Sequence, residues 1–234
     1  MFGNVTPTPF DLNFSLFGIP VRIHPFFWLV AILTGWNPYL PKLIVIWVAC
    51  FFVSILVHEM GHALTAKYYG WGPHVVLYSF GGYAAFTPTW GYSTGRSIFV
   101  TFAGPGAGFI LYAVVRAIEF ALVHQRVELS PYAEVALTNL KNINLWWGLV
   151  NLLPVFPLDG GQICRTALMH WRPSDGFEIA LKLSLVTACA MALFCYQYGR
   201  THENFPFDPL FTALLFGALA FENLQMLQRP RSPW

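Results

Sequence analysis

Two histidines and a glutamate share one short motif, His58-Glu59-Met60-Gly61-His62. Histidines four residues apart lie one turn apart on the same face of a helix. Two imidazoles placed in this way can bind one zinc ion, and the intervening glutamate can act as a general base on a water held by the metal. The motif follows an uncharged apolar run, residues 43–57, where ionisable groups are expensive unless they have a function.

A catalytic zinc site needs a third protein ligand, and acidic residues are scarce in this chain. Asp159 stands out because it ends the segment Asn151-Leu-Leu-Pro-Val-Phe-Pro-Leu-Asp and is followed by two glycines. The prolines break a helix there, and the glycines allow a tight turn. The Asn151 amide can donate a hydrogen bond to the oxyanion that develops during peptide hydrolysis. Two simpler interpretations stay open, namely Asp159 as a helix cap and Asn151 as a contact between membrane helices.

The composition that surrounds these residues is that of a membrane protein. Of the 234 residues, 56% are hydrophobic and only 10% are charged, whereas soluble domains carry about 25% charged residues. We therefore expect an all-α polytopic membrane fold with about six transmembrane helices, over residues 25–39, 42–69, 97–122, 136–153, 177–198 and 210–227. The net charge of +2 is too small to indicate nucleic-acid binding, and the composition specifies no oligomeric state.

Two stretches predict a small membrane-associated β element. Residues 1–23 are typical of N-terminal strands, because glycine and proline interrupt a β-branched run. Residues 75–88 are too apolar for an ordinary loop and too rich in glycine and tyrosine for a helix, so we expect a strand or hairpin at the membrane surface, with a strand over 78–86. Repeats and polar linkers are not apparent, which predicts a single domain over residues 1–234.

The distribution of lysine and arginine predicts how the chain is oriented in the membrane. If the N-terminus is cytosolic, the inner side holds seven basic residues and the outer side three. The seven are Arg22, Lys67, Arg96, Arg165, Arg172, Arg229 and Arg231, and the three are Lys42, Arg126 and Arg200. Arg116, Lys141 and Lys182 are not assigned to either side. Cytosolic loops carry the excess of basic residues. We therefore expect a multi-pass protein of the cell (inner) membrane whose termini and active-site opening are cytosolic.

Three motifs in order also carry a resemblance to a known family. They are the HEMGH sequence in an apolar segment, the Phe80-Gly81-Gly82 region, and the segment from Asn151 to Gly161. On these residues the chain resembles the site-2 protease family of intramembrane zinc metalloproteases. The stretches 16–25 and 103–106 also look like the family, so the resemblance covers nearly the whole chain.

The resemblance implies one catalytic Zn²⁺ held by His58, His62 and Asp159. It also implies catalysis by Glu59, with Asn151 supporting the substrate or the transition state. The activity implied is that of a zinc metalloendopeptidase that cleaves peptide bonds within or near transmembrane segments, as in regulated intramembrane proteolysis. Its partners would be transmembrane protein substrates and the lipid bilayer. Many family members add a PDZ or CBS domain, and we expect neither here.

Two other classes of protein are weighed against a protease. A non-proteolytic scaffold of the same fold would bind membrane helices, but such a protein has no reason to keep the base Glu59 beside three metal ligands. A transporter or channel would line a path with polar residues, but intramembrane charges are few and no inverted repeat is visible. A separate signal comes from Gly104 to Gly108, whose GxxxG spacing predicts close packing between membrane helices.

Overall fold

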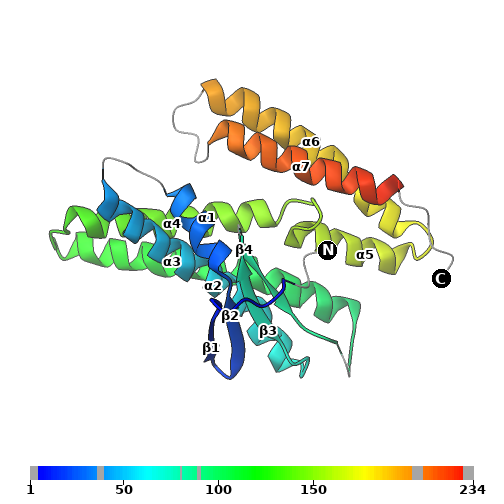
Figure 1. The fold of residues 1–234 in the computed structure, drawn as a ribbon, viewed down its shortest axis with the longest axis horizontal. Coiled ribbons are helices and arrows are strands. Elements are labelled where there is room, and N and C mark those ends of the chain that lie inside the picture. Colours follow the sequence, from blue (N-terminus) through cyan, green and yellow to red (C-terminus); the bar gives the residue numbers. More distant parts are fainter. Residues whose placement is uncertain (1–4, 36–39, 80, 89–90, 202–207, 229–234) are drawn as a thin grey trace. The chain divides into compact units, whose positions relative to one another are not determined.

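The computed structural model describes residues 5–35, 40–79, 81–88, 91–201 and 208–228. Helices make up most of this part of the chain, together with one small sheet (Figure 1). The elements in order are β1 (Leu12–Leu16), β2 (Ile19–Ile23), α1 (Pro25–Thr34), α2 (Pro41–Tyr68), β3 (His74–Tyr78), β4 (Gly81–Ala85), α3 (Thr94–His124), α4 (Pro131–Asn151), α5 (Asp159–Trp171), α6 (Gly176–Thr201) and α7 (Pro209–Gln228).

The chain divides into two compact units. The first comprises residues 1–93 and 103–148, and the second comprises residues 94–102 and 149–234. Helices α3 and α4 therefore contribute residues to both units. Such units are not separate domains by themselves, so the single domain expected over residues 1–234 remains a prediction.

The sheet belongs to the first unit and has the strand order β1-β2-β3-β4. Strands β1 and β2 form an antiparallel hairpin, β2 pairs with β3 in parallel, and β3 pairs with β4 antiparallel. The hairpin turns at Phe17 and Gly18, both with positive φ, which matches the right-handed twist of the flanking strands. Strand β4 is an edge of the sheet, so one side of its backbone has no partner strand among the described residues.

Helix α2 packs against this sheet and shares its hydrophobic core. The core joins Phe27 of α1, Phe51 and Ile55 of α2, and Val75 and Leu77 of β3. The rings of Phe27 and Phe51 stack with their centroids 5.5 Å apart. The next turn of α2 after Ile55 carries the HEMGH motif. The sheet therefore lies on the face of α2 that presents the predicted ligands.

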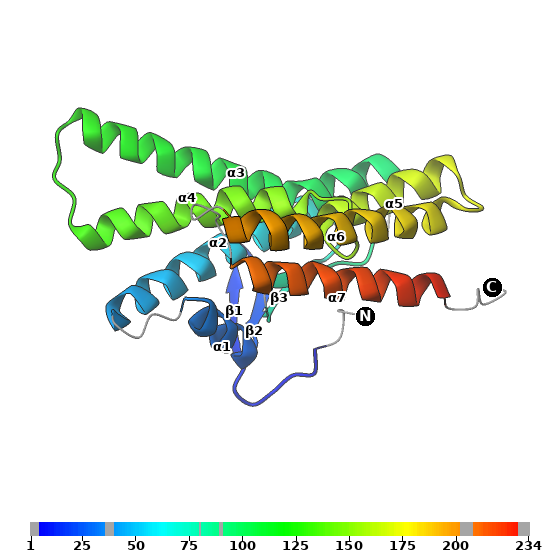
Figure 2. The same ribbon diagram turned by 90° about the horizontal axis from the view of Figure 1, so that it is seen from above.

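The second unit is built on the helix pair α6 and α7. These helices run side by side in both views (Figures 1 and 2). Val155, which precedes α5, is fully buried among apolar residues of the pair, including Ala188 and Cys195 of α6 and Phe216 and Ala220 of α7. The irregular segment between α4 and α5 is thus anchored in the core of this unit.

Four helices of the described chain are long and apolar enough to cross a membrane, namely α2, α3, α6 and α7. The protein is therefore of the multi-pass membrane class, but the predicted number of six spans is not confirmed. Helix α1 has only 10 residues, and residues 36–39 of its predicted span lie outside the described residues. Helix α4 has 21 residues but does not reach that apolarity, because polar residues such as Asn139, Lys141 and Asn142 interrupt it.

The small β element is present, with one difference in detail. The strand expected over residues 78–86 is a turn at Ser79 followed by β4 at Gly81–Ala85. Ser79 has a positive φ of 53°, which reverses the chain after β3. Val75 and Leu77 of β3 lie in the core, whereas the glycines that begin β4 let its backbone approach its neighbours closely.

Candidate metal centre

The HEMGH motif occupies a single turn of α2, as its spacing predicts. His58, Glu59 and His62 are all buried, with 4%, 5% and 7% of their surfaces exposed. The helix before them is uncharged back to Lys42. Burying three such groups in apolar surroundings is costly unless each has a partner, and metal coordination is one way to provide it.

The two imidazoles have the separation that a zinc ion requires. Their Nε2 atoms are 3.3 Å apart, and the rings meet edge to face at 79°. A tetrahedral zinc ion with Zn–N distances of about 2.05 Å holds two nitrogens about 3.3 Å apart. The histidine pair therefore fits two adjacent corners of a tetrahedral site.

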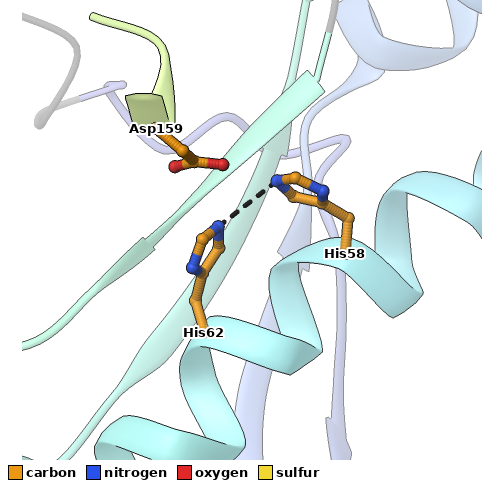
Figure 3. Close-up of side chains that lie close together, drawn as sticks. All are labelled: His58, His62 and Asp159. Atoms are coloured by element: carbon orange, nitrogen blue, oxygen red, sulfur yellow. Dashed lines mark hydrogen bonds between the residues drawn. The ribbon is translucent and has the colours of Figure 1, made fainter. Parts of the chain in front are cut away.

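Asp159 supplies the third candidate ligand. It is the first residue of α5 and is 8% exposed. One ligand atom each from His58, His62 and Asp159 lie within 4.8 Å of one another. Figure 3 shows the Asp159 carboxylate turned toward the ring nitrogens of both histidines. Two imidazole nitrogens and one carboxylate oxygen are a donor set typical of catalytic zinc, so the cluster can hold one zinc ion.

Helix α3 passes directly behind His62, and this approach depends on glycine. A Cβ atom added at Gly104 would overlap the Nε2, Cε1 and Cδ2 atoms of the His62 ring. One added at Gly61 of α2 would overlap the carbonyl oxygen of Ala103. The GxxxG pattern predicted close helix packing, but it gave no hint that Gly104 makes room for a candidate ligand.

Strand β4 lies close to Glu59. A Cβ atom added at Gly82 would lie 3.1 Å from Glu59 Cγ, 2.8 Å from Leu77 Cδ2 and 2.9 Å from the carbonyl oxygen of Val76. The edge strand of the sheet thus runs alongside the candidate base. The sequence predicted a strand over residues 78–86, whereas the close approach of Gly82 to Glu59 becomes visible only in three dimensions.

Two asparagines on α4 have different surroundings. Asn144 is buried and its Nδ2 donates to Ser54 Oγ on α2 and to Leu140 O, at 2.8 Å each. It therefore links α2 to α4, as expected of a packing residue. Asn151 is the last residue of α4 and is 9% exposed. Its role in supporting the transition state stays a prediction.

Comparison with known proteins finds similarity to a peptidase family and to zinc metalloproteases. The model of peptidase family M50 matches residues 133–194. A zinc metalloprotease of Methanocaldococcus jannaschii is 28% identical over 88% of this chain. Stage IV sporulation protein FB of Bacillus subtilis is 28% identical over 75% of this chain. The chain spans 58% and 56% of the lengths of these two relatives.

A solved structure shares the fold. The site-2 protease from Methanocaldococcus jannaschii superposes with a TM-score of 0.60 over 96% of this chain and 99% of that one, at 24% identity. This likeness establishes the fold. Together with the sequence relatives, it confirms the resemblance that the three motifs predicted.

Removing both histidines should abolish metal binding. We expect the purified protein to hold about one zinc ion per chain and the His58→Ala, His62→Ala double variant to hold none. Elemental analysis after dialysis against a weak chelator would measure this. His74→Ala is the matched control, because His74 is exposed on β3. A double variant with full zinc content would refute the ligand assignment.

Adding one methyl group at Gly104 should weaken the metal site. In Gly104→Ala the His62 ring must rotate away from its present position, so we expect zinc affinity to fall by about 10- to 100-fold, the usual effect of disturbing a ligand's support. Chelator competition would measure the affinity. Gly108→Ala is the control, because its Cβ would lie 3.6 Å from Asn144, an ordinary contact. Equal affinities in the two variants would contradict this reading of α3.

Proposed function

We propose that this relative of the site-2 proteases is a zinc metalloendopeptidase that cleaves peptide bonds within or near transmembrane segments of other proteins. The observation that carries the proposal is the cluster of His58, His62 and Asp159 ligand atoms, with Glu59 adjacent to the first histidine on a buried turn of α2. Relatives named as zinc metalloproteases favour this activity over a non-proteolytic scaffold.

Each residue would have one task. His58, His62 and Asp159 would hold the zinc ion. When bound, the ion would polarise the carbonyl of the peptide bond to be cut and lower the pKa of its own water ligand. Glu59 would accept a proton from the attacking water and return it to the leaving amine. Asn151 would donate a hydrogen bond to the oxyanion of the tetrahedral intermediate. The burial of the HEMGH turn would exclude lipid and bulk water from this chemistry.

The edge strand β4 would receive the substrate. A transmembrane helix has its amides already hydrogen-bonded, so the segment to be cut must unwind before attack. An extended segment can then pair with the free edge of a sheet through its backbone. Strand β4 has such an edge among the described strands, and Gly82 places it against Glu59. Strand addition at β4 would therefore bring the scissile peptide bond beside the candidate base.

The same proposal extends to the membrane arrangement. We place α1 and α4 in the membrane with the four apolar helices, giving six membrane helices. Polar residues of α4 such as Asn144 and Lys141 are paired within the protein, to Ser54 and Glu119, which lets them lie at membrane depth. The excess of basic residues on one side supports cytosolic termini and an active site that opens toward the cytosol of a cell-membrane protein.

Substrates are then expected to be membrane proteins with segments that unwind readily. Such segments contain helix-breaking residues near the cleavage point, because these lower the cost of exposing a peptide bond. The partners of the chain are thus transmembrane protein substrates and the surrounding bilayer.

Replacing the candidate base should stop proteolysis without removing the metal. We expect Glu59→Gln to lower the rate of cleavage by about 10²- to 10⁴-fold while zinc content stays at the wild-type level. The measurement is co-expression with a panel of tagged single-span proteins, followed by analysis of cleavage products. Glu128→Gln, an exposed carboxylate outside the site, is the control. Cleavage by Glu59→Gln at the wild-type rate would exclude this mechanism.

A methyl group at Gly82 should disturb catalysis rather than metal binding. In Gly82→Ala the new Cβ would press on Glu59 Cγ and on β3, so we expect the turnover rate to fall by about 10- to 100-fold with little change in zinc affinity. Gly81→Ala is the matched control, because its Cβ would meet only the edge of the Trp147 ring, at 3.2 Å. If both alanine variants turned over substrate equally well, β4 would not be the strand that serves Glu59.

A further inference from the structure

The candidate ligand Asp159 directly follows an irregular loop, residues 152–158. The position of Asp159 therefore depends on the conformation of that loop. Within the loop, Val155 N–H donates to Leu153 O at 2.7 Å and Leu158 N–H donates to Val155 O at 2.8 Å. Both of these bonds are local. The histidines differ in this respect, because the continuous helix α2 fixes their spacing.

The loop is packed tightly onto the first turn of α5. A Cβ added at Gly160 would overlap the carbonyl of Leu152, and one added at Gly161 would overlap the backbone nitrogen of Phe156. Both glycines are buried. Backbone therefore lies directly on backbone here, so any shift of the Phe156 peptide is passed to the turn that carries Asp159.

Two side chains from distant helices hold Phe156 by its main chain. The Phe156 N–H donates to Ser184 Oγ of α6 at 2.9 Å. Asn223 Nδ2 of α7 donates to the Phe156 carbonyl oxygen at 2.7 Å and also to Leu219 O at 2.8 Å. Ser184 and Asn223 are 1% and 0% exposed. Both polar groups of one residue are thus fixed by buried side chains far away in sequence.

We infer that Ser184 and Asn223 are positioning residues for Asp159, acting through the main chain of Phe156. The inference rests on the proposed zinc site and adds to it the part of the chain that holds the third ligand in place. Residues that orient a metal ligand without touching the metal typically change metal affinity by about 10- to 100-fold when they are removed. A ligand at the first residue of a helix, directly after a loop, depends more on such support than ligands within a continuous helix.

A purely structural role gives a different expectation. If the two hydrogen bonds served only to hold α6 and α7 to the loop, their loss would lower the melting temperature of the zinc-free protein and leave zinc affinity unchanged. Zinc affinity and zinc-free melting temperature together therefore separate the two roles.

The experiment uses the full chain, purified in detergent. Zinc dissociation constants are measured by chelator competition for the wild type, Ser184→Ala and Asn223→Leu, together with the melting temperature of each zinc-free protein. Thr212→Val is the matched control, because Thr212 is a buried polar residue of α7 whose Oγ1 donates to Asp208 O near the start of its own helix. We expect about 10- to 100-fold weaker zinc binding in the first two variants and wild-type binding in the control.

The outcomes are distinguishable. Wild-type zinc affinity in Ser184→Ala would overturn the inference, as would an equal loss in Thr212→Val. If Asn223→Leu failed to fold, Ser184→Ala would decide alone, because alanine suits a helix interior and removes only one oxygen. Zinc binding without any proteolysis would contradict the proposed function, and the affinities would still decide this inference. A wild-type protein that bound no zinc would overturn the metal site and the inference with it.

Discussion

The rest of the site depends on one constraint: three ionisable side chains are buried in one turn of an apolar helix, and neighbouring elements must provide their surroundings. His58, Glu59 and His62 have almost no exposed surface. An unpaired polar or charged group in such surroundings costs several kcal/mol, so the turn is tolerable only where partners surround it closely. A bound zinc ion would give the two histidines a partner, and strand β4 and helix α3 lie close against the same turn. The site is thus enclosed by the protein's own backbone as much as by side chains.

Close enclosure explains why glycine recurs around the motif. Gly104 of α3 gives room to the His62 ring, and Gly82 of β4 gives room to Glu59. Glycine in a helix interior costs about 0.5–1 kcal/mol relative to alanine, so α3 gives up stability at a position where a methyl group would overlap the ring of the candidate ligand His62. At Gly108, one turn later, a methyl group would make only ordinary contacts. The requirement for glycine is therefore local to the site.

The sequence predicted the features that depend on neighbouring residues, but not the contacts between residues far apart in the chain. The spacing of the HEMGH motif identified the helix and its ligand face, and the prolines before Asp159 identified a helix break. Helix α4 is less apolar than we expected of a membrane span. Its polar residue Asn144 donates a hydrogen bond to Ser54 of α2, and the sequence around Asn144 does not reveal that partner. Asn223 lies far beyond Asp159 in the chain, and one asparagine in an apolar helix resembles many others.

The amide of Asn223 is difficult to explain by stability alone. Its Oδ1 atom is fully buried and has no hydrogen-bond partner in the described part of the chain, and an unpaired buried acceptor costs about 1–3 kcal/mol. An apolar residue of similar size would avoid that cost within α7. What it could not do is donate to the Phe156 carbonyl, which lies in the loop that leads to Asp159. The histidines obtain their geometry from the regular backbone of α2. Asp159, the candidate third ligand, has no such frame. We infer that its position depends instead on buried polar side chains of α6 and α7, which hydrogen-bond to the loop that precedes it.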